Sequence, residues 1–94
     1  MKYYLSLGSN INAEENIAFA IEELKKILSN VTISSTYKTK AEGFEGDDFL
    51  NLVLVGDSTL DFESLNNKLK IVEDASGRKR DVPKFSARTL DIDI

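Results

Sequence analysis

The end of the chain carries the residues best suited to chemistry. Asp91 and Asp93 lie two residues apart in a run of β-formers, and Arg88 lies three residues before the first of them. Alternate side chains of a strand share a face, so we expect both carboxylates to point the same way. A carboxylate pair suits Mg²⁺, which proteins usually bind through one or two carboxylates and substrate phosphates. Because arginine offers a fork for phosphate oxygens, the segment predicts phosphoryl chemistry.

Length and composition narrow the class of protein. The 94 residues are enough for one small domain, expected over 1–94. A net charge of −4 argues against a general nucleic-acid binder. The chain has no cysteine and no histidine, so a metal would have to be bound by oxygen ligands. No signal peptide or membrane span is recognisable, and we expect a cytoplasmic protein.

The arginines are concentrated near the acidic pair. All three, Arg78, Arg80 and Arg88, lie in the final seventeen residues together with Lys79 and Lys84. Such forked donors beside two carboxylates would suit a magnesium polyphosphate. The alternative is a solvated, charged loop, and charge composition alone favours that alternative.

Hydrophobic periodicity predicts the elements that position these residues. The first half of the chain is expected to form a strand over 2–7 that ends at the turn signal 8–10, a helix over about 13–29 with Asn12 as N-cap, and a strand over 31–37. The second half is expected to form a strand over 49–55, a second helix, and a strand from near Thr89. The second helix would be capped by Asp61 or Thr59 and end at Gly77, and its apolar residues are Phe62, Leu65, Leu69 and Val72. This order predicts an α+β, ferredoxin-like βαββαβ fold, with an antiparallel four-stranded sheet and two helices on one face. Because the chain stops at Ile94 inside a strand, we expect a truncated form of a longer protein.

Asn51 is the polar exception on an apolar strand. A buried amide needs partners, which either the backbone or a flat heterocycle can supply. Phe49 lies on the same face and could pack beside such a ring. Two further features stay open in the same way. The turn 8–10 could bind an anion or simply turn, and Glu73 could face a ligand or, more commonly, solvent.

Four short motifs occur in order with matching spacing: L-G-S-N at 7–10, S-S-T-Y-K-T at 34–39, D-F-L-N at 48–51 and R-T-L-D-I-D at 88–93. In these motifs the chain resembles the 6-hydroxymethyl-7,8-dihydropterin pyrophosphokinase family over all 94 residues. Enzymes of that family transfer pyrophosphate from ATP to the pterin hydroxymethyl group in folate biosynthesis, and their core is also ferredoxin-like. The resemblance implies two Mg²⁺ ions, ATP as co-substrate, and a monomer that binds neither nucleic acid nor membrane.

The resemblance also implies a role for each site residue. The metal ligands would be Asp91 and Asp93. The pterin would be bound by Thr39, Phe49 (where tyrosine is usual), Asn51 and Phe85 (where tryptophan is frequent). The nucleotide would be bound by Lys70, Glu73, Arg80, Arg88 and Ile94. The catalytic arginines would be Arg78, Arg80 and Arg88.

The chain departs from the family pattern in several places. Ser86 and Ala87 replace a usual Gly-Pro, and Lys70 stands where glutamine is common. The family pattern continues after the R-T-L-D-I-D motif with further nucleotide and pterin contacts, and we expect this form to lack that segment. We therefore expect weak activity or none from this form. The alternatives are a catalytically silent ligand-binding module, an inactive or engineered core fragment, and a nucleic-acid-binding four-stranded module. The acidic balance and the aspartate pair count against the last.

Overall fold

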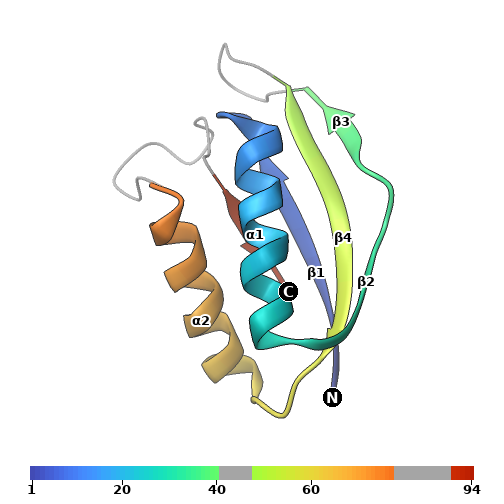
Figure 1. Ribbon diagram of the computed structural model, residues 1–94, viewed down its shortest axis with the longest axis vertical. Helices are drawn as coiled ribbons and strands as arrows, with labels where there is room; N and C mark the ends of the chain where they lie inside the picture. Colours follow the sequence, from blue (N-terminus) through green and yellow to red (C-terminus); the bar gives the residue numbers. More distant parts are fainter. Residues whose placement is uncertain (41–47, 78–89) are drawn as a thin grey trace.

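The computed structural model describes residues 1–40, 48–77 and 90–94. The elements are β1 (Lys2–Ser9), α1 (Ala13–Ile27), β2 (Ser29–Ile33), β3 (Tyr37–Thr39), β4 (Phe49–Asp57), α2 (Phe62–Ala75) and β5 (Asp91–Asp93) (Figure 1). Neither of the two helices in this part of the chain is long and apolar enough to cross a membrane.

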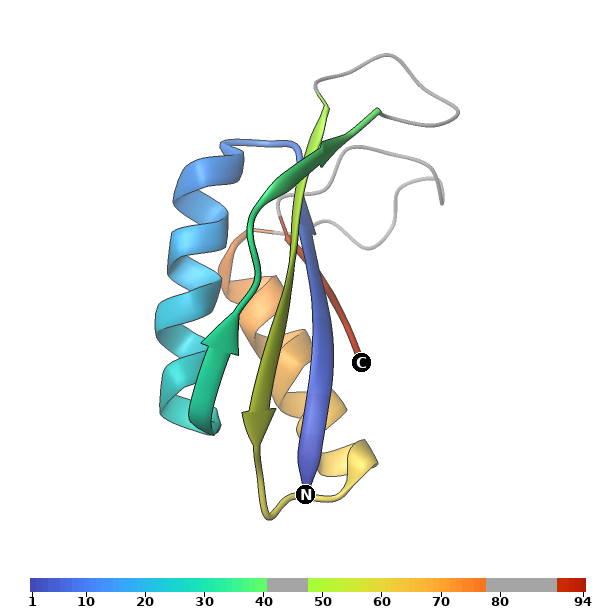
Figure 2. The ribbon, with the colours of Figure 1, turned by 90° about the vertical axis from the view of Figure 1, so that its right-hand side faces the viewer.

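The strands form one antiparallel sheet in the order β2-β4-β1-β5, with β3 also paired to β4. Both helices pack on the same face of this sheet (Figure 2). The α+β, ferredoxin-like prediction is confirmed, with β1 and β4 at the centre and β5 at one end. Within the described residues the sheet has five strands, whereas four were expected.

The additional strand arises because the predicted strand over 31–37 is divided into β2 and β3. Ser34 lies between the two, and its backbone N–H donates to the Val53 carbonyl at 2.8 Å. Its hydroxyl oxygen accepts from the Val53 N–H, also at 2.8 Å. A side-chain oxygen thus takes the place of a backbone carbonyl, which interrupts the regular ladder. The prediction of one continuous strand was therefore wrong, although both pieces pair with β4.

Alternation along the strands separates a buried face from the opposite face. In β1, Tyr3, Leu5 and Leu7 are buried, and the residues between them as far as Ser6 are exposed. These apolar side chains pack with the inward positions of both helices, with Leu52 and Leu54 of β4 and with Ile92 of β5. The core therefore lies between the sheet and the helix layer. We call the opposite side the open face; its positions include Tyr4, Ser6, Gly8, Phe49, Asn51, Val53, Val55, Asp91 and Asp93.

The two helices begin differently. Asn12 occupies the N-cap position of α1, as predicted, but it adopts a left-handed φ of 45° and its side chain makes no capping hydrogen bond. At the start of α2, the Asp61 carboxylate accepts a hydrogen bond from the Ser64 N–H at 2.8 Å. The predicted Asp61 cap is thus confirmed.

The remaining predictions for α2 are mostly confirmed. Leu65, Leu69 and Val72 are buried. Gly77 follows the helix with φ of 87°, the left-handed conformation typical of the residue after a helix end. Phe62 was wrongly assigned to the apolar face, because its side chain is 60% exposed at the first position of the helix.

Candidate functional site at the open face

Strand β1 brings the two candidate binding regions onto one row of the sheet. Gly8 is paired with Asn51 of β4 on one side and with Asp91 of β5 on the other. Directly opposed residues in a sheet point to the same face, so Asn51 and Asp91 both project from the open face. The neighbouring row, Leu7 with Ile92, is buried under the helices. Asn51 and Asp91 are two interstrand spacings apart, or about 10 Å.

The acidic pair occupies β5. Asp91 is half-buried opposite Gly8, Asp93 is exposed opposite Ser6, and Ile92 between them is 3% exposed. The predicted alternation is therefore confirmed, and both carboxylates lie on the open face. Within residues 1–40, 48–77 and 90–94, no three acidic side chains gather as a metal site. A cation here would take two protein carboxylates and complete its shell with phosphate or water oxygens, which fits Mg²⁺.

The second region is a polar pair at the junction of β3 and β4. The side-chain nitrogen of Asn51 donates to the Thr39 hydroxyl at 2.9 Å and to the Phe49 carbonyl at 3.3 Å. The donors of the amide are thus directed at acceptors within the protein. Its carbonyl oxygen is the part best placed to accept a hydrogen bond from a ligand.

Gly8 separates the two regions and was not recognised as a site residue from the sequence. A Cβ atom at this position would lie 3.1 Å from Asn51 Oδ1 and 3.7 Å from Phe49 Cδ1. Only glycine lets these side chains approach the β1 backbone so closely. The predicted end of this strand at residue 7 was wrong, because β1 continues to Ser9. A glycine within a strand is the signal that could have identified this close approach.

Glu73 lies on the other side of β5, in α2. Its side chain is only 4% exposed, and its Oε2 atom accepts a hydrogen bond of 2.7 Å from the backbone N–H of Ile92. The reading of Glu73 as a solvent-facing helix residue is therefore wrong. The carboxylate holds the backbone at the residue between the two aspartates. Contact between Glu73 and ATP stays a prediction.

The other candidates fall into two groups. Lys70 is exposed on α2, and Ile94 is 41% exposed directly after β5. The candidates Arg78, Arg80, Phe85 and Arg88 lie outside the described residues.

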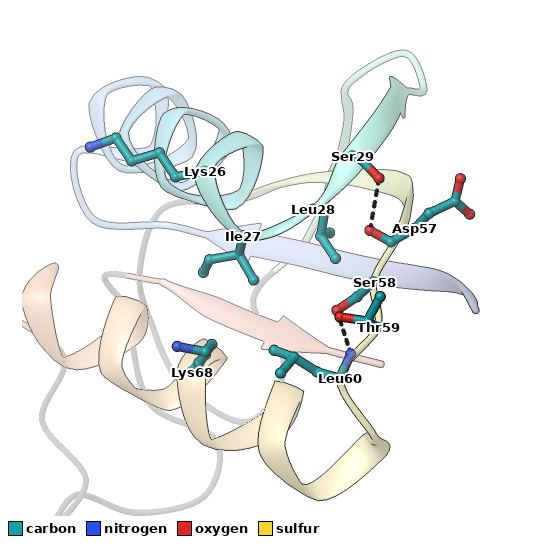
Figure 3. A pocket seen from close by; sticks show the side chains of 9 residues that line it. All are labelled: Lys26, Ile27, Leu28, Ser29, Asp57, Ser58, Thr59, Leu60 and Lys68. Atoms are coloured by element: carbon teal, nitrogen blue, oxygen red, sulfur yellow. Dashed lines mark hydrogen bonds between the residues drawn. The ribbon is translucent and has the colours of Figure 1, made fainter.

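A cavity of about 470 Å³ lies at the opposite end of the sheet (Figure 3). It is lined by Lys26, Ile27, Leu28, Ser29, Asp57, Ser58, Thr59, Leu60 and Lys68. Asp57 is paired with Lys2, at the far end of β1 from Gly8. The Lys26 ammonium is 2.8 Å from the Glu23 carboxylate, whose hydrogen bond raises the pKa of the lysine. None of the candidate site residues lines this cavity.

The fold and the open face define an α+β, ferredoxin-like domain with an acidic pair and an amide–hydroxyl pair on one surface. The family model for 7,8-dihydro-6-hydroxymethylpterin-pyrophosphokinase matches residues 4–94, and the chain belongs to this family. It is 43% identical over 93 residues to the 2-amino-4-hydroxy-6-hydroxymethyldihydropteridine pyrophosphokinase of Aquifex aeolicus. It is 34% identical over 98 residues to the folate synthesis bifunctional protein of Chlamydia trachomatis.

The matches cover nearly all of this chain but only part of each relative. The Aquifex match spans 97% of this chain and 58% of that protein. The Chlamydia match spans 96% of this chain and 22% of the bifunctional protein. The family that the motifs suggested is thus supported by similarity along nearly all of the chain.

Proposed function

We propose that the protein transfers pyrophosphate from ATP to the hydroxymethyl group of 6-hydroxymethyl-7,8-dihydropterin, with release of AMP and dependence on Mg²⁺. Membership of the family supports the reaction. The observation that carries the assignment to this surface is the register of β5, β1 and β4, which places Asp91 and Asn51 on one face with only Gly8 between them. A separation of about 10 Å suits a substrate whose ring and reacting group bind at different points.

The pterin ring would bind beside Asn51. The Asn51 carbonyl oxygen would accept from ring N–H groups, while the Thr39 hydroxyl keeps the amide in a fixed orientation. Phe49 lies on the same face and offers an apolar surface for the flat ring. These contacts would direct the hydroxymethyl group along the row toward β5.

Asp91 and Asp93 would hold the Mg²⁺ ions, two of them by resemblance to the family. When bound, such ions would neutralise phosphate charge and lower the pKa of the attacking hydroxyl. In the transfer, the hydroxyl oxygen forms a bond to the β-phosphorus of ATP. The bond from that phosphorus to the α,β-bridging oxygen breaks, and AMP leaves.

Further residues would act on the nucleotide. Arg78, Arg80 and Arg88 would bind the triphosphate and stabilise the charge that develops during transfer. Lys70, Glu73 and Ile94 are proposed to lie against the nucleotide. Phe85 is proposed to stack on the pterin. Cytoplasmic location and a monomeric state likewise stay predictions.

The test is an assay of AMP release with ATP, Mg²⁺ and 6-hydroxymethyl-7,8-dihydropterin, comparing the wild type with Asp91→Ala and Asp93→Ala. Loss of a carboxylate should lower the rate by about a thousandfold, because several kcal/mol of charge stabilisation are lost with the metal. Asp57→Ala, which removes an aspartate at the far end of the sheet, is the matched control.

Two outcomes would contradict the proposal in different ways. Equal AMP release by the wild type and both site variants would refute the metal assignment. No AMP release by the wild type, together with pterin binding in calorimetry, would favour a silent ligand-binding module. The silent-module alternative is tested because the match covers only 58% of the length of the Aquifex relative.

A further inference from the structure

The carboxylate of Glu73 satisfies a backbone group at the end of the sheet. β5 is the last strand of the described order and pairs with β1 alone. In an antiparallel pair, successive residues alternate between sharing backbone hydrogen bonds with the partner strand and not sharing them. The N–H of Ile92 bonds to Glu73 Oε2 at 2.7 Å. Both residues are buried, at 4% and 3% exposure, so this bond is shielded from water.

We propose that Glu73 is a positioning residue for the metal-binding pair, an inference that rests on the function proposed above. Ile92 lies between Asp91 and Asp93, and rotation of its peptide would redirect both carboxylates. A charge-assisted hydrogen bond resists that rotation, because breaking it would leave the buried N–H of Ile92 without this acceptor.

The position of Glu73 argues for action through the backbone. α2 packs on the helix-covered side of β5, whereas the two aspartates project from the open face. Among the described residues, Glu73 does not gather with the aspartates into a three-carboxylate site. It therefore orients the strand that carries the ligands instead of serving as a third ligand.

The test uses the full 94-residue chain with Glu73→Gln and Glu73→Leu. Glutamine keeps an acceptor oxygen of the same reach, and leucine removes it. Glu63→Gln and Glu63→Leu are matched controls, because Glu63 is an exposed glutamate of the same helix. Amide exchange of Ile92, followed by NMR, reports the hydrogen bond. Titration of Mn²⁺ with α,β-methylene-ATP, whose α,β bridge cannot be cleaved, reports the metal pair by electron paramagnetic resonance.

We expect Glu73→Leu to speed the exchange of the Ile92 amide and to weaken Mn²⁺ binding by about 10- to 100-fold, the usual cost of losing a group that orients a metal ligand. Glu73→Gln should still protect the Ile92 amide, and its Mn²⁺ affinity should stay much closer to that of the wild type. Because Glu73 is also proposed to lie against the nucleotide, metal-free nucleotide binding is measured in both variants, and in Glu73→Leu the loss of Mn²⁺ affinity should exceed any loss of nucleotide affinity. If Glu73→Leu does not fold, Glu73→Gln still tests the proposal. In this variant, any change in Mn²⁺ affinity must be accompanied by a change in the protection of the Ile92 amide.

The possible failures are distinguishable. Wild-type Mn²⁺ affinity in Glu73→Leu, with Ile92 unprotected, would overturn the positioning role alone. Weak Mn²⁺ binding in Glu73→Gln, with Ile92 still protected, would show that the charge of Glu73 acts directly, and would also overturn it. A wild-type chain that binds no Mn²⁺ with the nucleotide analogue would refute the metal assignment on which the inference rests.

Discussion

The side-chain amide of Asn51 donates a hydrogen bond of 2.9 Å to the hydroxyl of Thr39, which joins the adjacent strands β4 and β3 through their side chains. The same amide lies over the backbone of Gly8, where a Cβ atom would be 3.1 Å from its oxygen. Contacts on two sides therefore fix the orientation of the group that we propose to bind the pterin.

Thr39→Val should weaken pterin binding, because valine keeps the shape of threonine but removes the acceptor for the Asn51 amide. We expect a loss of about tenfold in affinity, or roughly 1.4 kcal/mol, the size of one hydrogen bond. Calorimetric titration with 6-hydroxymethyl-7,8-dihydropterin measures this loss. Thr39→Ser retains the hydroxyl and should bind almost as the wild type does. Equal affinities for valine and serine variants would refute the orienting role.

Gly8→Ala should disturb the pterin region while leaving nucleotide binding unchanged. The added methyl group forces Asn51 Oδ1 to shift by a few tenths of an ångström from its position. We expect pterin affinity to fall by about three- to tenfold, since a misdirected acceptor loses most of a hydrogen bond. Ser6→Ala, two residues earlier on the same face of β1, is the control and should have no effect. An unchanged pterin affinity in Gly8→Ala would show that the amide can adapt.

Two positions on α2 should differ sharply in their contribution to stability. Leu69 is 1% exposed in the core, whereas Ile71 is 67% exposed on the same helix. Leu69→Ala should lower the free energy of unfolding by about 2–5 kcal/mol, because it leaves a cavity. Ile71→Ala should change it by about 0.5 kcal/mol or less. Urea unfolding followed by circular dichroism measures both, and similar losses would contradict the assigned packing of α2.

The N-cap of α2 should make stability depend on pH. The Ser64 N–H that donates to Asp61 lowers the pKa of this carboxyl below its ordinary value of 3.8. Because the folded pKa lies below the unfolded one, the contribution is present above the unfolded pKa and is lost as the pH falls through the folded pKa.

Asp61→Ala should therefore be less stable than the wild type at neutral pH, and the difference should shrink as the pH falls below about 4. Asp61→Asn keeps a capping acceptor without a titrating charge and serves as the control. Thermal unfolding at a series of pH values measures the effect. A difference between wild type and Asp61→Ala that stays constant down to pH 2 would contradict the role of the charge.

The regular elements could be predicted because their signals are local. Alternation in β1 and β4 and the helical spacing of Leu65, Leu69 and Val72 depend only on neighbouring residues, and the core contains them as expected. The division into β2 and β3 could not be predicted in this way. It depends on the Ser34 hydroxyl meeting the Val53 N–H, which is a contact between strands.

The candidate site shows the same limit. The shared face of Asp91 and Asp93 follows from alternation within one strand. The closeness of Gly8 to Asn51 and the bond from Ile92 to Glu73 depend on strand register and helix placement, which no single segment encodes. Glu73 was assigned to the nucleotide by resemblance alone, and its burial became evident only from the packing of α2 against β5.

The arrangement of β5 also bears on self-association. Among the described residues, β5 pairs with β1 alone. A strand edge without a partner is a template on which a second molecule can add its own strand and begin to aggregate. Any incoming strand at this edge would compete with Glu73 for the Ile92 amide and would approach two negatively charged side chains. Glu73, Asp91 and Asp93, which we propose to act in metal binding, would thus also disfavour polymerisation through this edge.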